Sequence, residues 1–174
     1  MANTTGKKIK DAAIIGGCAS LIYLTIGDIS YRLSLSRGGL NSKLITDMVA
    51  KSAAKKPKNE YKEKLDSMID DGADWFMHQD TEKIIIEKKH RQSLYADLIR
   101  PDKPSNVYII CIHGYTSSPA NMGIYAKKYH ELGYNVLLPS LRGHGDSEQD
   151  FITVGWNDRL DVSEGVIDIT ERKP

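Results

Sequence analysis

The spacing of hydrophobic and polar positions divides the chain into three parts. Residues 12–27 carry no charged side chain and follow a basic start, Lys7-Lys8-Ile9-Lys10. Residues 29–75 place apolar side chains three or four positions apart, which is typical of helices with one apolar face. From residue 82 onward, short apolar runs alternate with turn residues and helical patterns, which is typical of a sheet with crossover helices.

The uncharged residues 12–27 predict an N-terminal apolar helix. Sixteen helical residues are about 24 Å long, somewhat short of a hydrocarbon core of about 30 Å, and Ile29 and Tyr31 extend the apolar stretch beyond Asp28. A basic start before an apolar run favours a single-pass signal anchor, and it also fits a cleaved signal peptide. A third interpretation is a buried core helix of a soluble protein. We assign residues 1–28 to the signal anchor or signal peptide, with residues 12–27 contacting the membrane.

Residues 29–75 are predicted to be a helical connecting segment. Apolar residues recur at helical spacing on both sides of Pro57: Leu40, Leu44, Ile45 and Met48 before it, and Tyr61, Leu65, Met68 and Ile69 after it. Pro57 ends the first run because proline removes a helix hydrogen bond and clashes with the preceding turn. The segment is interpreted as a connection and not as a source of chemistry.

Residues 76–174 are predicted to form one α/β domain. Residues 84–98 combine a β-branched run with apolar–polar alternation, which predicts an antiparallel hairpin. The unbroken apolar runs 107–112 and 135–138 predict parallel strands that are buried on both faces, and Pro139 is expected to end the second. The order of hairpin, strand, helix, strand and helix describes an α/β sheet.

Two helices belong to this predicted domain. The first lies between Ser118, which is expected to cap it, and Gly133, which is expected to close it, with Pro119 at its first position. The second covers residues 156–169, where apolar side chains again follow a helical spacing, although Gly165 weakens the pattern. The first of these helices connects the two predicted parallel strands.

Composition and charge narrow the function classes. A net charge of +1, from 24 basic and 23 acidic residues, gives no electrostatic reason to expect a nucleic-acid partner. Two cysteines exclude a disulfide-dense secreted scaffold. The five histidines form no H-x-H or H-E-x-x-H pair, so we predict no metal site. Gly143-x-Gly145 lacks the third glycine of a dinucleotide fingerprint, and no cofactor is expected.

Two loops follow the predicted parallel strands, at the edge of the sheet where α/β proteins form their ligand sites. The first is His113-Gly114-Tyr115-Thr116-Ser117-Ser118, and the second is Arg142-Gly143-His144-Gly145-Asp146-Ser147. A glycine directly after a strand permits a tight turn that leaves backbone N–H groups unpaired. Such donors hold the oxyanion that forms during acyl transfer.

Five stretches in register resemble the α/β-hydrolase family. They are His113-Gly-Tyr-Thr, Asn121-Met-Gly-Ile-Tyr-Ala-Lys-Lys-Tyr, Gly133-Tyr-Asn-Val-Leu-Leu-Pro, Arg142-Gly-His-Gly-Asp-Ser and Gly155-Trp-Asn-Asp-Arg-Leu-Asp. More narrowly, the chain resembles membrane-anchored or cell-surface serine hydrolases of Gram-positive bacteria, of the serine aminopeptidase and lysophospholipase type. The resemblance is dense over residues 75–161. It implies that residues 76–174 form the N-terminal half of an α/β-hydrolase sheet.

The resemblance also implies roles for individual residues. It assigns the backbone N–H of Tyr115 to the oxyanion hole, and His113 and Gly114 to the substrate-binding turn beside it. It assigns a buttressing role to the second loop, through Arg142, Gly143, His144, Gly145 and Ser147. Position 140 is serine where relatives commonly have aspartate, which puts one buttressing contact in doubt.

The 174 residues contain no Gly-x-Ser-x-Gly nucleophile elbow, and Gly145-Asp-Ser-Glu-Gln fails at its last position. We therefore expect the N-terminal portion of a serine hydrolase, truncated before the nucleophile Ser and its Asp and His partners, and inactive by itself. The complete enzyme would cleave a small-molecule ester, amide or peptide substrate. We expect it to be anchored on the outer cell surface, or secreted if residues 1–27 are cleaved. The alternative is a non-catalytic membrane-anchored module of this fold, or a disrupted-gene product.

Overall fold

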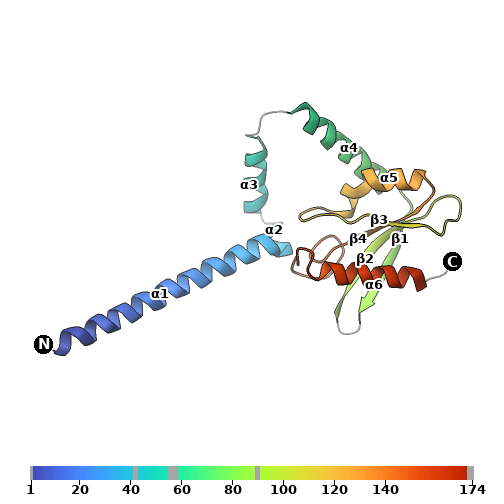
Figure 1. Ribbon diagram of the computed structural model, residues 1–174. Coiled ribbons are helices and arrows are strands. Elements are labelled where there is room, and N and C mark those ends of the chain that lie inside the picture. Colours follow the sequence, from blue (N-terminus) through green and yellow to red (C-terminus); the bar gives the residue numbers. More distant parts are fainter. Residues whose placement is uncertain (1, 41–42, 55–58, 89–90, 172–174) are drawn as a thin grey trace.

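The computed structural model describes residues 2–40, 43–54, 59–88 and 91–171. Helix α1 (Ala2–Leu35) is a single long helix that leads away from the rest of the molecule (Figure 1). The predicted apolar helix is thus confirmed, and it continues past Asp28 to Leu35. Three further helices lie between α1 and the sheet: α2 (Arg37–Leu40), α3 (Lys43–Ala54) and α4 (Glu60–Met77).

The sheet has four strands in the order β1-β2-β4-β3. Strands β1 (Glu82–Lys88) and β2 (Arg91–Ile99) form the predicted antiparallel hairpin. Strands β3 (Tyr108–Ile110) and β4 (Asn135–Ser140) form the predicted parallel pair, and β2 joins β4 in antiparallel orientation. The mixed sheet with a parallel pair therefore agrees with the predicted fold class.

Two strand boundaries differ from the prediction. Strand β3 is three residues long instead of covering 107–112, because its pairing with β4 stops at Ile110–Leu137 and is followed only by a bond from Cys111 N to Leu137 O, 2.8 Å. Strand β4 continues through Pro139, which lies opposite Ala96, and ends at Ser140. Proline removes one donor from the ladder but keeps the extended backbone, so the strand does not have to end there.

Helices cover both faces of the sheet (Figure 1). Helices α4 and α5 (Gly123–Glu131) pack on one face, where Val136 and Leu138 join a core with Ala126. Helix α6 (Asp158–Glu171) lies on the other face, where Leu137 joins a second core with Ile169. Successive side chains of a strand point to opposite faces, so two covered faces require the continuous apolar run 135–138.

The connection between β3 and β4 differs in detail from the prediction. A 3-10 turn (Pro119–Met122) precedes α5, and Ser118 at its N-terminus makes no side-chain capping hydrogen bond. Pro119 does occupy the first position, and Gly133 follows the helix with φ +83°, as a helix-ending glycine does. The expected Ser118 cap is therefore wrong, because the tighter turn leaves the hydroxyl outside capping geometry.

The C-terminal end of α1 is attached to the loop that precedes α6. The carbonyl of Leu35 accepts a hydrogen bond from the Ile152 amide, 2.8 Å, and the amide of Arg37 donates to the Asp150 carbonyl, 2.9 Å. Between them, Ser36 and Phe151 form an antiparallel β-bridge. The apolar helix therefore ends directly on a loop of the α/β domain.

Candidate active site

An open cleft of about 510 Å³ lies between the loop after β3 and the loop after β4. Both loops leave the carboxyl ends of neighbouring parallel strands, so the sheet brings them together as expected. Of the residues singled out in the sequence, His113, Gly114, Tyr115 and His144 line the cleft. The first residues of α6 close its far side.

The turn of the first loop holds Tyr115 outside the sheet. The last ladder bond is made by Cys111, and the turn is closed by a hydrogen bond from Ser117 N to Gly114 O, 3.2 Å. Thr116 has φ +57°, a left-handed conformation that is uncommon for a β-branched residue. Strain of this kind gathers at functional sites. The Tyr115 hydroxyl donates to the carbonyl of Ser34, in the last turn of α1.

His113 is buried and fixed in one tautomer. Its Nδ1 contacts the Gly114 carbonyl at 3.0 Å, and its Nε2 accepts a hydrogen bond from the Leu141 amide at 3.1 Å. An Nε2 that accepts carries no proton, so Nδ1–H donates and the ring is neutral. Burial is the main cause that lowers the pKa of His113, and the neighbouring His144 lowers it further. His113 therefore ties the first loop to the second as an uncharged residue.

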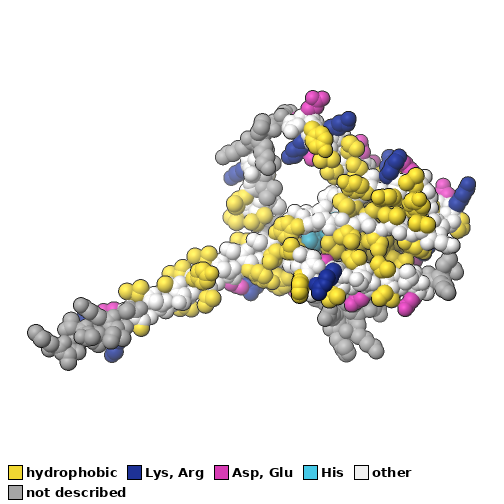
Figure 2. Space-filling view, viewed as in Figure 1, with side chains coloured by type: hydrophobic (Ala, Val, Ile, Leu, Met, Phe, Trp, Pro, Cys, Tyr) yellow, Lys and Arg dark blue, Asp and Glu magenta, His cyan; other side chains and the backbone are white. Residues whose placement is uncertain are grey.

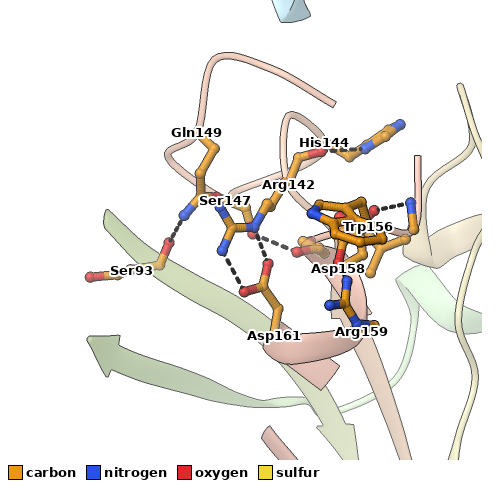
Figure 3. Close-up of polar contacts among 12 residues, drawn as sticks. Ser93, Arg142, His144, Ser147, Gln149, Trp156, Asp158, Arg159 and Asp161 are labelled. Atoms are coloured by element: carbon orange, nitrogen blue, oxygen red, sulfur yellow. Dashed lines mark hydrogen bonds and ion pairs between the residues drawn. The ribbon is translucent and has the colours of Figure 1, made fainter. Parts of the chain in front are cut away.

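His144 faces the cleft with one free ring nitrogen. Its ring centroid lies 4.8 Å from that of His113, and its Nδ1 contacts the Arg142 carbonyl at 2.8 Å (Figure 3). Its Nε2 is buried and has no hydrogen-bond partner, and the same is true of Oδ1 of Asp158, another residue that lines the cleft. Buried polar atoms without partners are costly.

The second loop is fastened to α6 and to β4. Arg142 forms a two-pronged, largely buried ion pair with Asp161, with Nη2 2.7 Å from Oδ1 (Figure 3). This contact raises the pKa of the Arg142 guanidinium. The fully buried Ser147 donates from its hydroxyl to the Ser140 carbonyl, 2.5 Å. Arg142 and Ser147 are not among the residues that line the cleft, and their contacts hold the loop to α6 and β4.

Two glycines allow the second loop to pass close to its neighbours. Gly143 has φ +71°, and a Cβ there would lie 2.9 Å from Ile152 Cγ1. Gly145 has φ +50°, and a Cβ there would lie 2.6 Å from the Ser140 hydroxyl. Position 140 therefore holds a small side chain where the loop crosses the end of β4.

Sequence reasoning missed several residues of the cleft: Ile152, Val154, Asp158 and Arg159. Ile152 and Val154 lie in residues 148–154, which follow no periodic pattern. Asp158 and Arg159 lie in the stretch 155–161 that carries part of the resemblance, but no role was assigned to them there. An acidic residue at the start of a predicted helix was the available signal for Asp158. Within the described residues, no group of three or more His, Cys, Asp or Glu side chains is placed to hold a metal ion.

No protein-family model matches the chain. A thermostable monoacylglycerol lipase of Bacillus sp. (strain H-257) is 37% identical over 60 residues, which are 34% of this chain and 24% of the lipase. Two crystal forms of the Pyrococcus furiosus esterase Pf2001 superpose with a TM-score of 0.51 and 28% identity over 57% of this chain. The chain spans 38–39% of the esterase, and so less than half of each of these relatives.

Proposed function

We propose that this chain, which has the fold of the N-terminal part of an α/β-hydrolase, supplies the oxyanion-binding part of a serine hydrolase site that cleaves esters or amides. The observation that carries the proposal is the Gly114–Tyr115 turn. It follows a parallel strand, lies outside the sheet and borders a cleft. The similarity of part of the chain to a lipase and an esterase supports this chemistry.

The role of the turn follows from the charge that acyl transfer creates. Attack on a carbonyl carbon turns its oxygen into an oxyanion, and fixed N–H dipoles in a partly dry site stabilise it. We assign the Tyr115 N–H to this oxyanion. The neutral His113 ring, bonded to the Gly114 carbonyl and to the Leu141 amide, holds the turn against the second loop without adding a charge.

The nucleophile is assigned outside these 174 residues, because they contain no Gly-x-Ser-x-Gly elbow. An oxyanion hole without a nucleophile binds but does not acylate. The chain by itself is therefore proposed to be inactive. Helix α1, which contains a stretch long and apolar enough to cross a membrane at Ala13–Leu35, is proposed to anchor the protein at the cell surface.

The missing nucleophile gives a direct prediction. The purified 174-residue chain, incubated with a fluorophosphonate probe that reacts with activated serines, is expected to show no more labelling than the heat-unfolded chain. A serine esterase treated in parallel serves as the positive control. Stoichiometric labelling of the folded chain would show that it carries a nucleophile of its own and would contradict this assignment.

The oxyanion role is tested in a complete enzyme. The DNA after codon 174 is read for a Gly-x-Ser-x-Gly motif in any frame, and the encoded segment is joined to the chain. Tyr115→Pro, which removes the backbone donor together with the tyrosine side chain, is expected to lower kcat for ester hydrolysis by about 10²–10³-fold. Tyr115→Phe keeps that donor and is expected to retain most of the activity. Absence of the motif would favour the non-catalytic module. Equal activity of the two variants would contradict the assignment of the Tyr115 N–H to the oxyanion.

A further inference from the structure

We propose that the end of α1 holds the candidate cleft at the level of the lipid headgroups, so that its substrates are amphiphiles such as acyl lipids, taken from the bilayer. The inference rests on the proposed hydrolase function and on α1 as a membrane span. A membrane anchor alone does not fix the position of the cleft, because a domain on a flexible tether would leave the cleft free in solution.

The exposed apolar side chains of α1 indicate that something other than this chain shields them from water. No residue of the stretch Ala13–Leu35 is buried in the structure, and Leu33 and Leu35 at its end are half-buried. Nine of its large apolar side chains are 49–78% exposed: Ile14, Ile15, Leu21, Ile22, Tyr23, Leu24, Ile26, Ile29 and Tyr31. They follow the helix on the visible side in Figure 2. A continuous apolar surface of this length fits a hydrocarbon layer, since a helix that is apolar all round is not stable in water.

The length of the span fixes the depth of its end. The apolar stretch begins at Ala13, so the roughly 20 helical residues that cross a hydrocarbon core end at Arg32. Leu35 lies three residues further along the helix, about 4.5 Å. Each headgroup layer is about 5–8 Å thick. Leu35 therefore lies within the headgroup layer, shortly after Arg32, which forms an exposed ion pair with Asp28, 2.9 Å.

The domain is fastened to α1 at this depth. The Tyr31 ring stacks on Phe151 with centroids 5.5 Å apart, one turn before the β-bridge of Ser36 and Phe151. The Arg37 guanidinium donates to the carbonyls of His144 and Ser147 in the second site loop. Ring stacking, backbone bonds and a buried guanidinium together leave little freedom of rotation, so the position of the helix end fixes that of the loop.

The cleft itself touches the end of α1. Tyr115, whose backbone borders the cleft, donates its hydroxyl to the Ser34 carbonyl. In Figure 2, histidine surface is visible where α1 meets the domain, with hydrophobic side chains around it. The cleft opening is therefore next to the helix end and not on the far side of the domain.

The rim of the cleft has the character of a membrane-interface surface. Val154 is 66% exposed and Trp156 is 73% exposed, and the Arg159 guanidinium lies 4.4 Å from the centre of the Trp156 ring. Val154 has φ +46°, which is strained for a β-branched residue. Tryptophan, with an apolar ring and a polar N–H, is enriched at the headgroup level, and an arginine there faces lipid phosphates. Exposed apolar residues beside charges are suited to that layer.

The depth of Trp156 tests the proposal. The full chain is reconstituted in phosphatidylcholine vesicles, with Trp75→Phe so that Trp156 is the one tryptophan. Lipids brominated near the headgroup are expected to quench its emission more strongly than lipids brominated near the chain end. The matched control, Trp156→Phe, reports Trp75 of α4, which packs against the β-sheet core, and is expected to show no quenching.

A second variant separates docking from anchoring. Arg37→Ala with Phe151→Ala removes the hydrogen bonds of the Arg37 guanidinium and the Tyr31–Phe151 ring stacking but leaves the apolar stretch intact. The variant is expected to float with the vesicles like the parent and to lose the quenching of Trp156. Three outcomes would overturn the proposal: a parent that does not float, an inserted parent with unquenched Trp156, and an undocked variant with unchanged quenching. A parent chain that forms dimers through α1 instead of inserting into the vesicles would not float, and it would count as the first of these outcomes.

The measurement does not depend on hydrolysis. A finding that the Tyr115 N–H plays no part in hydrolysis would overturn the proposed function. It would leave the measured depth of Trp156 unchanged. Conversely, an unquenched Trp156 would leave the hydrolase proposal in place for water-soluble esters.

Discussion

His113 combines two demands on one side chain. Its ring is 2% exposed and connects two loops, with Nδ1 toward the Gly114 carbonyl and Nε2 toward the Leu141 amide. Only the neutral ring can donate at one nitrogen and accept at the other. Protonation would therefore break the Leu141 contact and place a charge among buried groups, next to His144 and in the field of Asp158.

The lowered pKa of His113 predicts a loss of stability in acid. The unfolded chain takes up a proton at the ordinary histidine pKa of about 6.5, whereas the folded chain does not. This contribution is complete above that pH. It falls as the pH drops below it, by up to about 1.4 kcal/mol per pH unit, until the folded pKa is reached. Urea unfolding of the chain in detergent micelles, measured from pH 7.5 downward, follows this change.

The control for this prediction is His78, a histidine whose side chain is exposed. His113→Gln is expected to flatten the dependence of unfolding free energy on pH just below about 6.5. His78→Gln, at a side chain that is 74% exposed, is expected to keep the slope of the parent. The slope is the quantity compared, because the first variant also changes the absolute stability. Equal slopes in all three chains would show that His113 does not titrate differently on folding.

At the scale of elements, two glycines allow α4 and α5 to cross at backbone contact. A Cβ on Gly72 would lie 2.3 Å from Ile124 N, and a Cβ on Gly123 would lie 1.9 Å from Gly72 O. The obstructing atoms belong to backbone, which cannot turn aside as a side chain can. This contact sets how closely α5 lies over the sheet, and α5 follows directly on the first site loop.

Gly72→Ala is expected to force the two helices apart and to destabilise the domain by about 1–3 kcal/mol, the usual cost of overpacking. Thermal unfolding followed by circular dichroism measures the loss. Gly38→Ala is the matched control, since a Cβ in α2 meets nothing within 4 Å and φ is not positive there. A Gly72→Ala chain as stable as the parent would show that the crossing can widen freely.

At the scale of the molecule, strand β3 forms one edge of the sheet. Among the described strands, β3 lies at the end of the order and pairs only with β4. Its neighbours along the chain, Val107 and Ile112, are each 47% exposed. An edge of this kind presents unpaired backbone groups to other chains.

Self-association through β3 is therefore expected in detergent micelles, and Val107→Lys is expected to increase the monomer fraction, because a charge on the edge opposes pairing. Sedimentation at several protein concentrations measures it. Leu65→Lys on α4 makes the same change of an exposed apolar residue away from the sheet edge. An equal increase in both variants would mean that general charge, and not the edge of β3, controls association.

Much of the architecture is encoded locally. The run 135–138 predicted a strand covered on both faces, and the alternation in 94–98 predicted one strand of a hairpin, because side-chain period reflects which faces are buried. Boundaries were less well determined. The end of β3 depends on where its pairing with β4 stops, and the failure of the Ser118 cap depends on a 3-10 turn, neither of which is visible in the local sequence pattern.

The sequence by itself determined the apolar helix, the order of strands and helices, and the two glycine-bearing loops at the carboxyl ends of the parallel strands, since each depends on neighbours within a few positions. Tertiary structure alone decided that Asp158 and His144 line the same cleft and that Arg37 reaches a loop more than one hundred residues away. Such contacts join residues that lie far apart in the sequence and share no hydrophobic periodicity. They form only once the domain has folded.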